Sequence, residues 1–446
     1  MNTISKFLEK KLLPIATVVA NNSYIQVLSQ TFISLIPIII IGAFSLILSK
    51  APIDYSGFEE GSYWYNFFLG WSSWTDQSLW PLKFINAATL GSLSLWVSVG
   101  IAYRWAKKHD MDLMSTIIVV FVNFILINSN IIEGGWSTAY FGGEGLFSAI
   151  IGSFLIVQLY RYLTKKEFGR INLPESVPPA LAKSMNSMIP MTICFLSSAV
   201  VTGASHALFG VSIPELIMTI GKPINNGVDN PFAPSLIYMG SNVGYWFGIH
   251  TAAIEAPFDP IMFGNLAVNA DAFAKGTAAS DLPYIVNIAL RYGFTGIGGS
   301  GATFGLVLLL IRSKSEGIRS VGKLSLIPAC FGINEPVVFG LPIMMNVTFL
   351  IPFLIVESVN TFIAYLAMYF NLLNRPIFFM GGTAPELLKS VLSNMDVRSV
   401  VYWFIAVIID IIIWYPFFKI FEKQKLEEEE QEKLTASSLA GKGENI

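Results

Sequence analysis

Residues 324–346, LSLIPACFGINEPVVFGLPIMMN, form an apolar stretch that no straight membrane-spanning helix can accommodate. Five helix-breaking residues interrupt it: Pro328, Gly332, Pro336, Gly340 and Pro342. Irregular backbone at membrane depth is tolerated only where it is buried in protein or lines a cavity, because lipid offers no hydrogen-bond partners. The stretch therefore predicts a re-entrant hairpin rather than a span.

One carboxylate, Glu335, stands in the middle of this stretch. A charge at the centre of a bilayer costs at least about 2.5 kcal/mol on insertion scales, so this side chain must face protein, water or a ligand. The sequence favours a hairpin that presents Glu335 to a polar substrate. The alternative is a kinked helix in which Glu335 makes only a structural hydrogen bond.

The composition is that of a multi-spanning membrane protein. The chain has 446 residues, of which 53% are hydrophobic and 13% are charged, against roughly 25% charged residues in an ordinary soluble domain. The formal net charge of −2 argues against nucleic acid as a partner. The cysteines and histidines lack the spacing of a metal site or a disulfide framework: Cys194, Cys330, His109, His206 and His250. No metal, cofactor or ATPase signature is predicted.

The placement of basic residues orients the apolar runs. Clusters of Lys and Arg at 104–108, 161–170, 312–323 and 419–425 follow apolar runs and indicate cytoplasmic ends. Between residues 214 and 284 the number of crossings, zero or two, stays open. The prediction is an all-α multi-spanning membrane protein with about eight to ten transmembrane helices, two re-entrant hairpins and both termini in the cytoplasm.

A second broken stretch, near 374–390, contains Pro376, Gly381, Gly382 and Pro385 and predicts the second hairpin. Broken helices and intramembrane polar groups concentrate after residue 210. The predicted parts are regular spans over 1–210 that begin with a surface amphipathic segment over 1–23, a transport domain over 211–420, and a solvated acidic tail over 421–446.

Two broken segments that approach the membrane midplane offer unwound backbone N–H and C=O groups to a polar ligand. The stretch SNVGYWFGIH, residues 241–250, supplies side chains that suit a sugar. Trp246 offers a flat apolar face, and Asn242 and His250 can hydrogen-bond hydroxyl groups. Packing at a helix interface is the alternative explanation for this cluster. His206 lies inside an apolar span, where a structural hydrogen bond is expected.

Two further carboxylates, Glu357 and Asp410, fall inside apolar runs. Each is expected to pair with a neighbouring helix, and an ion-coupling role is the open alternative. The glycine-rich patch 295–305 lies in an apolar run over 292–311 that predicts another span. Its small residues are expected to allow close helix packing.

Three segments carry a family resemblance. They are FGINEPVVFGLPI (331–343), GRINLPESVPPALAKSMNSMIP (169–190) and GGTAPE (381–386). They resemble the enzyme IIC subunit of the phosphotransferase system, and more narrowly its lactose/cellobiose/chitobiose family. The resemblance implies that the N-terminal spans form a homodimer interface and that the later half holds the sugar. It also implies that Glu335 is the functional glutamate and His250 the functional histidine.

The resemblance further implies group translocation across a bacterial cell membrane. A β-linked disaccharide enters, and its 6-hydroxyl is phosphorylated by a phosphocysteine on a separate cytoplasmic IIB protein, itself served by IIA, HPr and enzyme I. Glu335 would be the catalytic residue, because an ionised carboxylate can accept the hydroxyl proton. The predicted sugar contacts are His250, Glu335, Asn334, Trp246, Asn242, Gly382 and Thr383.

Two other functions are alternatives to this one. An ion-coupled secondary sugar transporter would use a buried carboxylate to bind a proton or sodium. A membrane-embedded hydrolase or glycosyltransferase needs a pair of acidic catalytic groups or a metal cluster, and neither is evident in the sequence. Whether the chain counts as an enzyme stays open, since the phosphocysteine would belong to IIB. The sequence also leaves the disaccharide itself undetermined.

Overall fold

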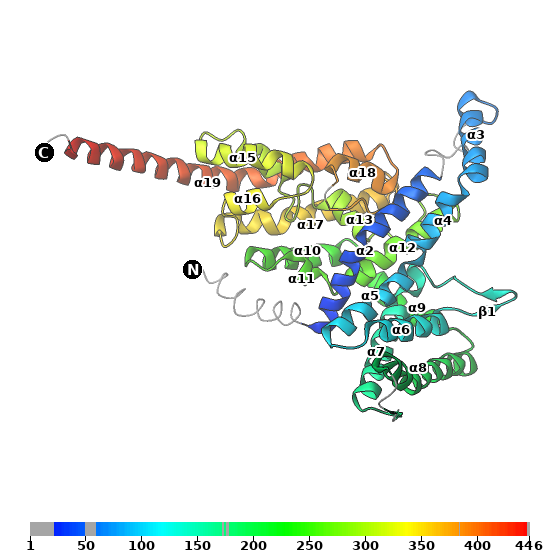
Figure 1. Cartoon of the computed structure of the whole chain (residues 1–446). Helices are drawn as coiled ribbons and strands as arrows, with labels where there is room; N and C mark the ends of the chain where they lie inside the picture. Colours follow the sequence, from blue (N-terminus) through cyan, green and yellow to red (C-terminus); the bar gives the residue numbers. More distant parts are fainter. Residues whose placement is uncertain (1–21, 50–58, 172–173, 175–177, 383, 444–446) are drawn as a thin grey trace. The chain divides into compact units, whose positions relative to one another are not determined.

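The computed structural model describes residues 22–49, 59–171, 174, 178–382 and 384–443 (Figure 1). The predicted all-α membrane fold is confirmed. Within these residues six helices are long and apolar enough to cross a bilayer, and β1 (Ile131–Ile132) with β2 (Gly135–Trp136) forms the one small sheet. The count of eight to ten crossings and the membrane depth of the hairpins stay predictions. The amphipathic segment predicted over 1–23 lies almost entirely outside the described residues.

The described chain divides into two compact units. The N-terminal unit consists of Asn21–Asp229 and Ala256–Asn287, and the C-terminal unit contains Asn230–Glu255 and Ile288–Ile446. Residues 211–229 and 256–287 were predicted to belong with the later half of the chain, but they cluster with the N-terminal unit. The C-terminal unit is thus assembled from two separate pieces of sequence.

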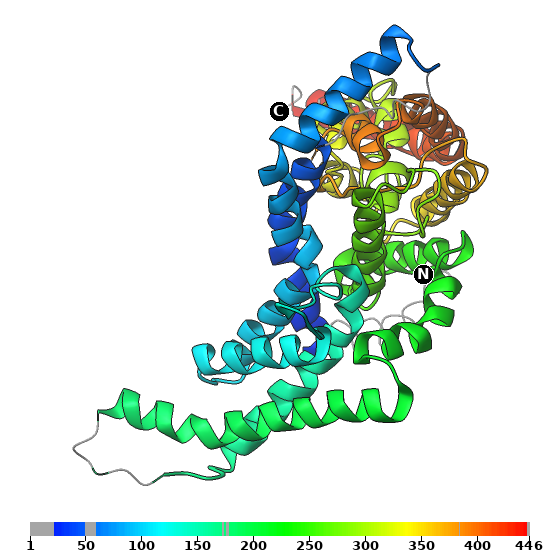
Figure 2. The same ribbon diagram turned by 90° about the vertical axis from the view of Figure 1, so that its right-hand side faces the viewer.

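The N-terminal unit is built from helices that pack around apolar faces, with α6 against α5, α7 and α8 (Figure 2). A glycine makes one of these contacts close. A Cβ at Gly42 would collide with Thr89, and the Asn86 side chain donates a hydrogen bond to the Gly42 carbonyl at 3.0 Å. Its elements are α2 Ser23–Leu48, α3 Tyr63–Ser78, α4 Trp80–Ala88, η2 Leu90–Ser92, α5 Leu93–Lys108, α6 Leu113–Asn128, η3 Gly143–Gly145, α7 Leu146–Lys165, α8 Pro179–Phe209, α9 Ile213–Val228 and α12 Asp259–Ala274.

The C-terminal unit has α17 at its centre, packed against both α10 and α19. The Asn346 side chain caps the start of α17 by accepting the Thr348 N–H at 3.0 Å. The far end of α19 projects beyond the neighbouring α15 and α16 (Figure 1). The elements are α10 Phe232–Trp246, α11 Thr251–Glu255, α13 Ile288–Leu290, η4 Arg291–Thr295, α14 Phe304–Leu310, α15 Glu316–Cys330, α16 Glu335–Gly340, α17 Val347–Tyr369, α18 Glu386–Asn394 and α19 Ser399–Gly443.

The apolar run over 292–311, predicted as a span, is not a continuous helix. Residues 291–295 form a single π-helical turn, 296–303 form a chain of turns, and α14 has only seven residues. Gly298, Gly299 and Gly301 all have positive φ, which a helix cannot contain. A hydropathy profile counts these small residues as apolar, so it does not register the break. We refer to residues 296–303 as the glycine turn.

Both predicted breaks interrupt helices. In the first, α15 ends at Cys330 and α16 begins at Glu335, with Gly332 at φ +78° between them. Pro336 occupies the first turn of α16, where a missing N–H costs nothing. In the second, residues 373–382 lack helical structure, and α18 starts at Glu386.

Candidate functional site

A cavity of about 660 Å³ lies inside the C-terminal unit, a size within the roughly 300–1,000 Å³ of small-molecule sites. We call it the C-terminal cavity. Both predicted breaks and the glycine turn reach its wall, so unwound backbone surrounds it on several sides. The residues that line it are Tyr245, His250, Thr251, Arg291, Tyr292, Gly296, Gly299, Ser300, Gly332, Ile333, Asn334, Glu335, Pro336, Glu357, Gly382, Glu386 and Lys389.

Glu335 and Asn334 sit side by side on this wall, at the start of α16. The Glu335 side chain is exposed rather than sealed among helices. Asn334 is buried, and its Nδ2 donates to the Ser300 carbonyl at 2.8 Å. A Cβ at Gly299 would lie 2.7 Å from the Asn334 side chain, so glycine permits this approach. The first broken segment is thereby fixed to the glycine turn.

His250 lines the same cavity from the turn between α10 and α11. Its Nδ1 accepts the Ala252 N–H at 3.2 Å, which leaves the proton on Nε2. The ring of Tyr245, another wall residue, lies 6.1 Å from the imidazole between centroids. His250 is therefore held as a hydrogen-bond donor beside an apolar ring.

The structure does not bring Asn242 or Trp246 to the cavity wall. Both are buried in α10, where Asn242 Nδ2 donates to Glu357 Oε2 at 2.9 Å. Trp246 Nε1 donates to the carbonyl of Asn346 at 3.2 Å. The sequence shows that polar and aromatic residues gather at the end of α10, but it does not show which face of the helix each side chain occupies. These two hold helices together.

The second broken segment contributes Gly382 to the wall. Gly382 lies near the Tyr292 ring, which packs edge-on against Phe379 at 5.1 Å between centroids. Thr383, the other residue predicted here, lies outside the described residues. Of the seven predicted sugar contacts, the cavity thus brings together His250, Glu335, Asn334 and Gly382.

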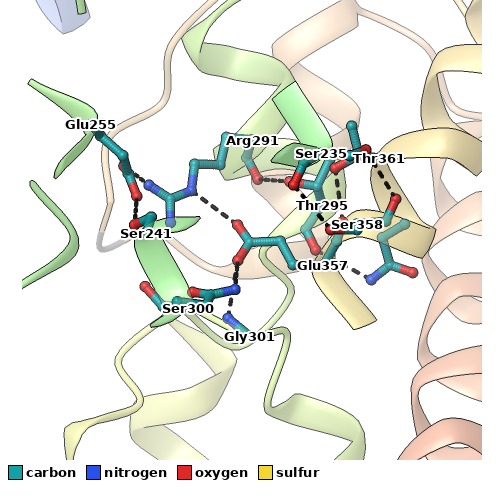
Figure 3. A network of polar contacts seen from close by, with 12 residues as sticks. Ser235, Ser241, Glu255, Arg291, Thr295, Ser300, Gly301, Glu357, Ser358 and Thr361 are labelled. Carbon is teal, nitrogen blue, oxygen red and sulfur yellow. Dashed lines mark hydrogen bonds and ion pairs between the residues drawn. The ribbon is translucent and has the colours of Figure 1, made fainter. Parts of the chain in front are cut away.

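Arg291 lines the cavity and forms the centre of a buried charge network (Figure 3). Its side chain is 6% exposed, pairs with Glu255, and donates from Nε to Glu357 Oε1 at 3.0 Å. Glu357 Oε2 also accepts the Gly301 N–H at 3.0 Å. The network ties η4, α11 and the glycine turn to α17. Removing Arg291 would leave two buried carboxylates unpaired, a loss of about 3–5 kcal/mol.

Asp410 on α19, the other carboxylate predicted to fall inside an apolar run, is fully buried and does not line the cavity. Its Oδ1 accepts a hydrogen bond from Asn360 at 2.9 Å, while Oδ2 has no hydrogen-bond partner among the described residues. Glu357 and Asp410 therefore have the interhelical contacts expected of structural partners.

Several wall residues escaped the sequence prediction. Arg291 stands at the edge of the apolar run over 292–311 and was not among the predicted site residues. The glycine turn was taken for a packing face, although five glycines between 296 and 305 are a signal for broken backbone. Glu386 and Lys389, three residues apart after the second break, have the spacing of a helical ion pair.

The cavity offers a free carboxylate, an imidazole and unwound backbone. Such a mixture of acceptors and donors suits a ligand with many hydroxyl groups. In the part of the chain that the structure describes, no three His, Cys, Asp or Glu side chains gather in a way that could hold a metal ion. The chemistry available is hydrogen bonding and proton acceptance.

Comparisons with known proteins place the chain in a family. The family model "Phosphotransferase system, EIIC" matches residues 29–356. The lichenan permease IIC component of Bacillus subtilis is 30% identical over 99% of this chain and 98% of its own. A lactose-specific EIICB component of Streptococcus mutans is 26% identical over 99% of this chain and 76% of its own length.

A solved structure extends the similarity to three dimensions. It is the transporter ChbC, the IIC component of the N,N'-diacetylchitobiose-specific phosphotransferase system. It superposes with a TM-score of 0.84 at 28% identity, covering 95% of this chain and 99% of the other. The sequence match, the shared fold and the polar cavity lead to one conclusion: this chain belongs to the EIIC family of the phosphotransferase system, as a multi-pass sugar permease of the cell membrane.

Proposed function

We propose that the C-terminal cavity binds a β-linked disaccharide of the cellobiose, diacetylchitobiose or lactose type and delivers it inward for phosphorylation. The observation that carries the proposal is that Glu335 and His250, far apart in sequence, line one cavity. Unwound backbone from three segments surrounds them and can meet further sugar hydroxyls. Relatives named for lactose and diacetylchitobiose support a β-linked substrate.

In the proposed reaction the donor is a phosphocysteine of a IIB partner. The sugar 6-hydroxyl oxygen attacks phosphorus, the new O–P bond forms as the S–P bond breaks, and the cysteine leaves as a thiolate. The Glu335 carboxylate accepts the hydroxyl proton and later releases it to water. His250 Nε2–H donates to the same sugar and orients it. The EIICB relative supports the pairing, since its name joins the two components.

The proposal assigns transport to the C-terminal unit and scaffolding to the N-terminal unit. In the proposed orientation both termini lie in the cytoplasm, because basic clusters close the apolar runs on that side. The N-terminal unit would also form the interface of a homodimer. IIA, HPr and enzyme I would act only through IIB.

Vesicle uptake tests the proposed function. Vesicles that contain the purified chain are given radiolabelled disaccharide together with phosphorylated IIB on the cytoplasmic side. The expected result is sugar phosphate on that side, and no accumulation when IIB is omitted. Absence of any sugar phosphate for every β-linked disaccharide tried would contradict the proposal.

The alternative is an ion-coupled secondary sugar transporter, and Asp410 is the observation that favours it. The unbonded Oδ2 of this buried carboxylate could carry a proton. In the same vesicles a proton or sodium gradient alone would then accumulate unmodified sugar. That outcome would replace group translocation with coupled transport.

A further inference from the structure

A buried acid–base pair at the start of α18 has no part in the proposed reaction. Glu386 and Lys389 lie one turn apart, and each side chain is 2% exposed. Lys389 Nζ donates to Glu386 Oε1 at 2.8 Å and to the Gly382 carbonyl at 3.3 Å. Charged side chains are rarely buried this fully, and here the pair holds the second broken segment against its helix.

The second carboxylate oxygen of Glu386, Oε2, does not bond Lys389. The Gly298 N–H faces this carboxylate, yet Oε2 makes no hydrogen bond of ordinary distance and angle with any described residue. A buried carboxylate oxygen without a hydrogen-bond donor lowers the stability of the folded protein. Such an atom is a candidate to accept a hydrogen bond from a ligand. Both Glu386 and Lys389 line the C-terminal cavity, the cavity of Glu335 and His250.

The first broken segment is shaped to fit this pair. A Cβ at Gly332 would lie 2.5 Å from Glu386 Oε1 and 2.8 Å from Lys389 Nζ, and Gly332 has φ +78°. Glycine therefore lets the segment that precedes Glu335 rest directly on the pair. The carboxylate of Glu386 is fixed by both broken segments, and a fixed acceptor gives more selectivity than a mobile one.

We propose that Glu386 Oε2 accepts a hydrogen bond from a ring hydroxyl of the bound disaccharide, with Lys389 as the residue that positions the carboxylate. The inference rests on the proposed function and names the substrate class more closely. Carboxylates outnumber cations on the cavity wall, with Glu335, Glu357 and Glu386 against Arg291 and Lys389. The site therefore selects a neutral sugar rich in hydroxyl donors and rejects a disaccharide that carries a uronic acid.

Equilibrium binding of radiolabelled disaccharides to the purified full chain tests this inference. Glu386→Gln is expected to weaken binding of a neutral β-linked disaccharide roughly fivefold to tenfold, because a neutral amide accepts a weaker hydrogen bond than a carboxylate does. One monodeoxy analogue is expected to bind the native chain more weakly by a similar factor. The loss caused by that analogue should be smaller in Glu386→Gln than in the native chain, because the neutral amide accepts only a weaker hydrogen bond from the same hydroxyl. Glu316→Gln, a 91% exposed carboxylate on α15, is the matched control and should bind normally.

A purely structural role for the pair makes a different prediction. Replacing both partners, Glu386→Leu with Lys389→Leu, removes the charges together and often leaves stability unchanged. A structural pair would then leave binding intact, whereas a sugar contact would be lost. Native-like affinity in Glu386→Gln, or no monodeoxy analogue with the expected loss, overturns this inference and leaves the proposed function standing. Failure of the native chain to bind any disaccharide overturns both.

Discussion

Three carboxylates of the C-terminal unit differ in what surrounds them, and their surroundings separate their roles. Both oxygens of Glu357 accept hydrogen bonds, from Arg291 and from Gly301 among others. Asp410 is enclosed on α19 beside Asn360. Glu335 alone of the three is exposed at the cavity wall. An acid that must meet a hydroxyl needs that access.

Glu335→Gln keeps the size of the side chain and removes its charge. If Glu335 accepts the hydroxyl proton, IIB-dependent phosphorylation should fall roughly 10²–10⁴-fold, the usual contribution of a general base. Disaccharide binding should fall far less, because an amide still hydrogen-bonds a hydroxyl. Both quantities can be measured on one vesicle preparation. Unchanged phosphorylation in this variant would refute the catalytic role.

His250→Ala removes the proposed Nε2–H donor. Disaccharide binding to the purified chain is expected to weaken about tenfold, as for the loss of one hydrogen bond of about 1–1.5 kcal/mol. His206→Ala is the matched control, since His206 lies on α8 in the N-terminal unit and outside the cavity wall. Equal affinity in His250→Ala and His206→Ala would make the cavity histidine structural.

At the scale of elements, the glycine turn and the two broken segments determine which backbone groups of the C-terminal unit can meet a ligand. The glycine turn is linked to α17 through Gly301 and Glu357, and to the first broken segment through Ser300 and Asn334. A continuous helix in its place would direct its backbone groups into its own ladder. Because the turn is unwound, its backbone is available at the cavity wall.

Gly301→Ala should destabilise the protein. Gly301 has φ +76°, and a Cβ there would collide with the Phe353 ring. Strain of about 1–2 kcal/mol from the left-handed backbone adds to that collision, so the melting temperature should fall by several degrees. Gly203→Ala, at an open position in the helix α8, should be neutral or slightly stabilising. Similar melting temperatures for the two variants would contradict this account of the turn.

Sequence reasoning located the breaks at Pro328 to Pro342 and after Pro376, since proline and glycine signal local geometry. It missed the glycine turn, because that signal was outweighed by an apolar average over 292–311. It selected Glu335 and His250 by chemistry, and both line the cavity. It could not place Asn242 and Trp246 away from the wall, because helix rotation depends on tertiary packing with α17. The ion pairs of Arg291 could not be predicted for a similar reason, because its partners Glu255 and Glu357 are distant in sequence.

At the scale of the molecule, two compact units share an interleaved chain. The C-terminal unit contains the cavity and all of its wall. The N-terminal unit has regular helices, and α3 exposes a row of aromatic side chains that includes Tyr63, Trp64 and Trp74. This division of content fits a scaffold unit and a binding unit.

The proposed homodimer predicts the mass of the protein particle in detergent solution. In mild detergent, light scattering corrected for bound detergent should give twice the 49.1 kDa of one chain. Cross-links should join residues of the N-terminal unit of the two copies, and cross-links between two C-terminal units should be absent. A single-chain mass at all protein concentrations would remove the homodimer from the proposal.

The central claim is that a disaccharide occupies the cavity enclosed by the broken segments. It is tested most directly by saturation binding of radiolabelled cellobiose, lactose and diacetylchitobiose to the purified chain and to Ser300→Trp, which fills the cavity from its wall. Ser320→Trp, on the exposed face of α15, is the control. The account predicts saturable binding of at least one sugar, kept in Ser320→Trp and weakened at least about tenfold in Ser300→Trp. Equal binding by the native chain and both variants would contradict it.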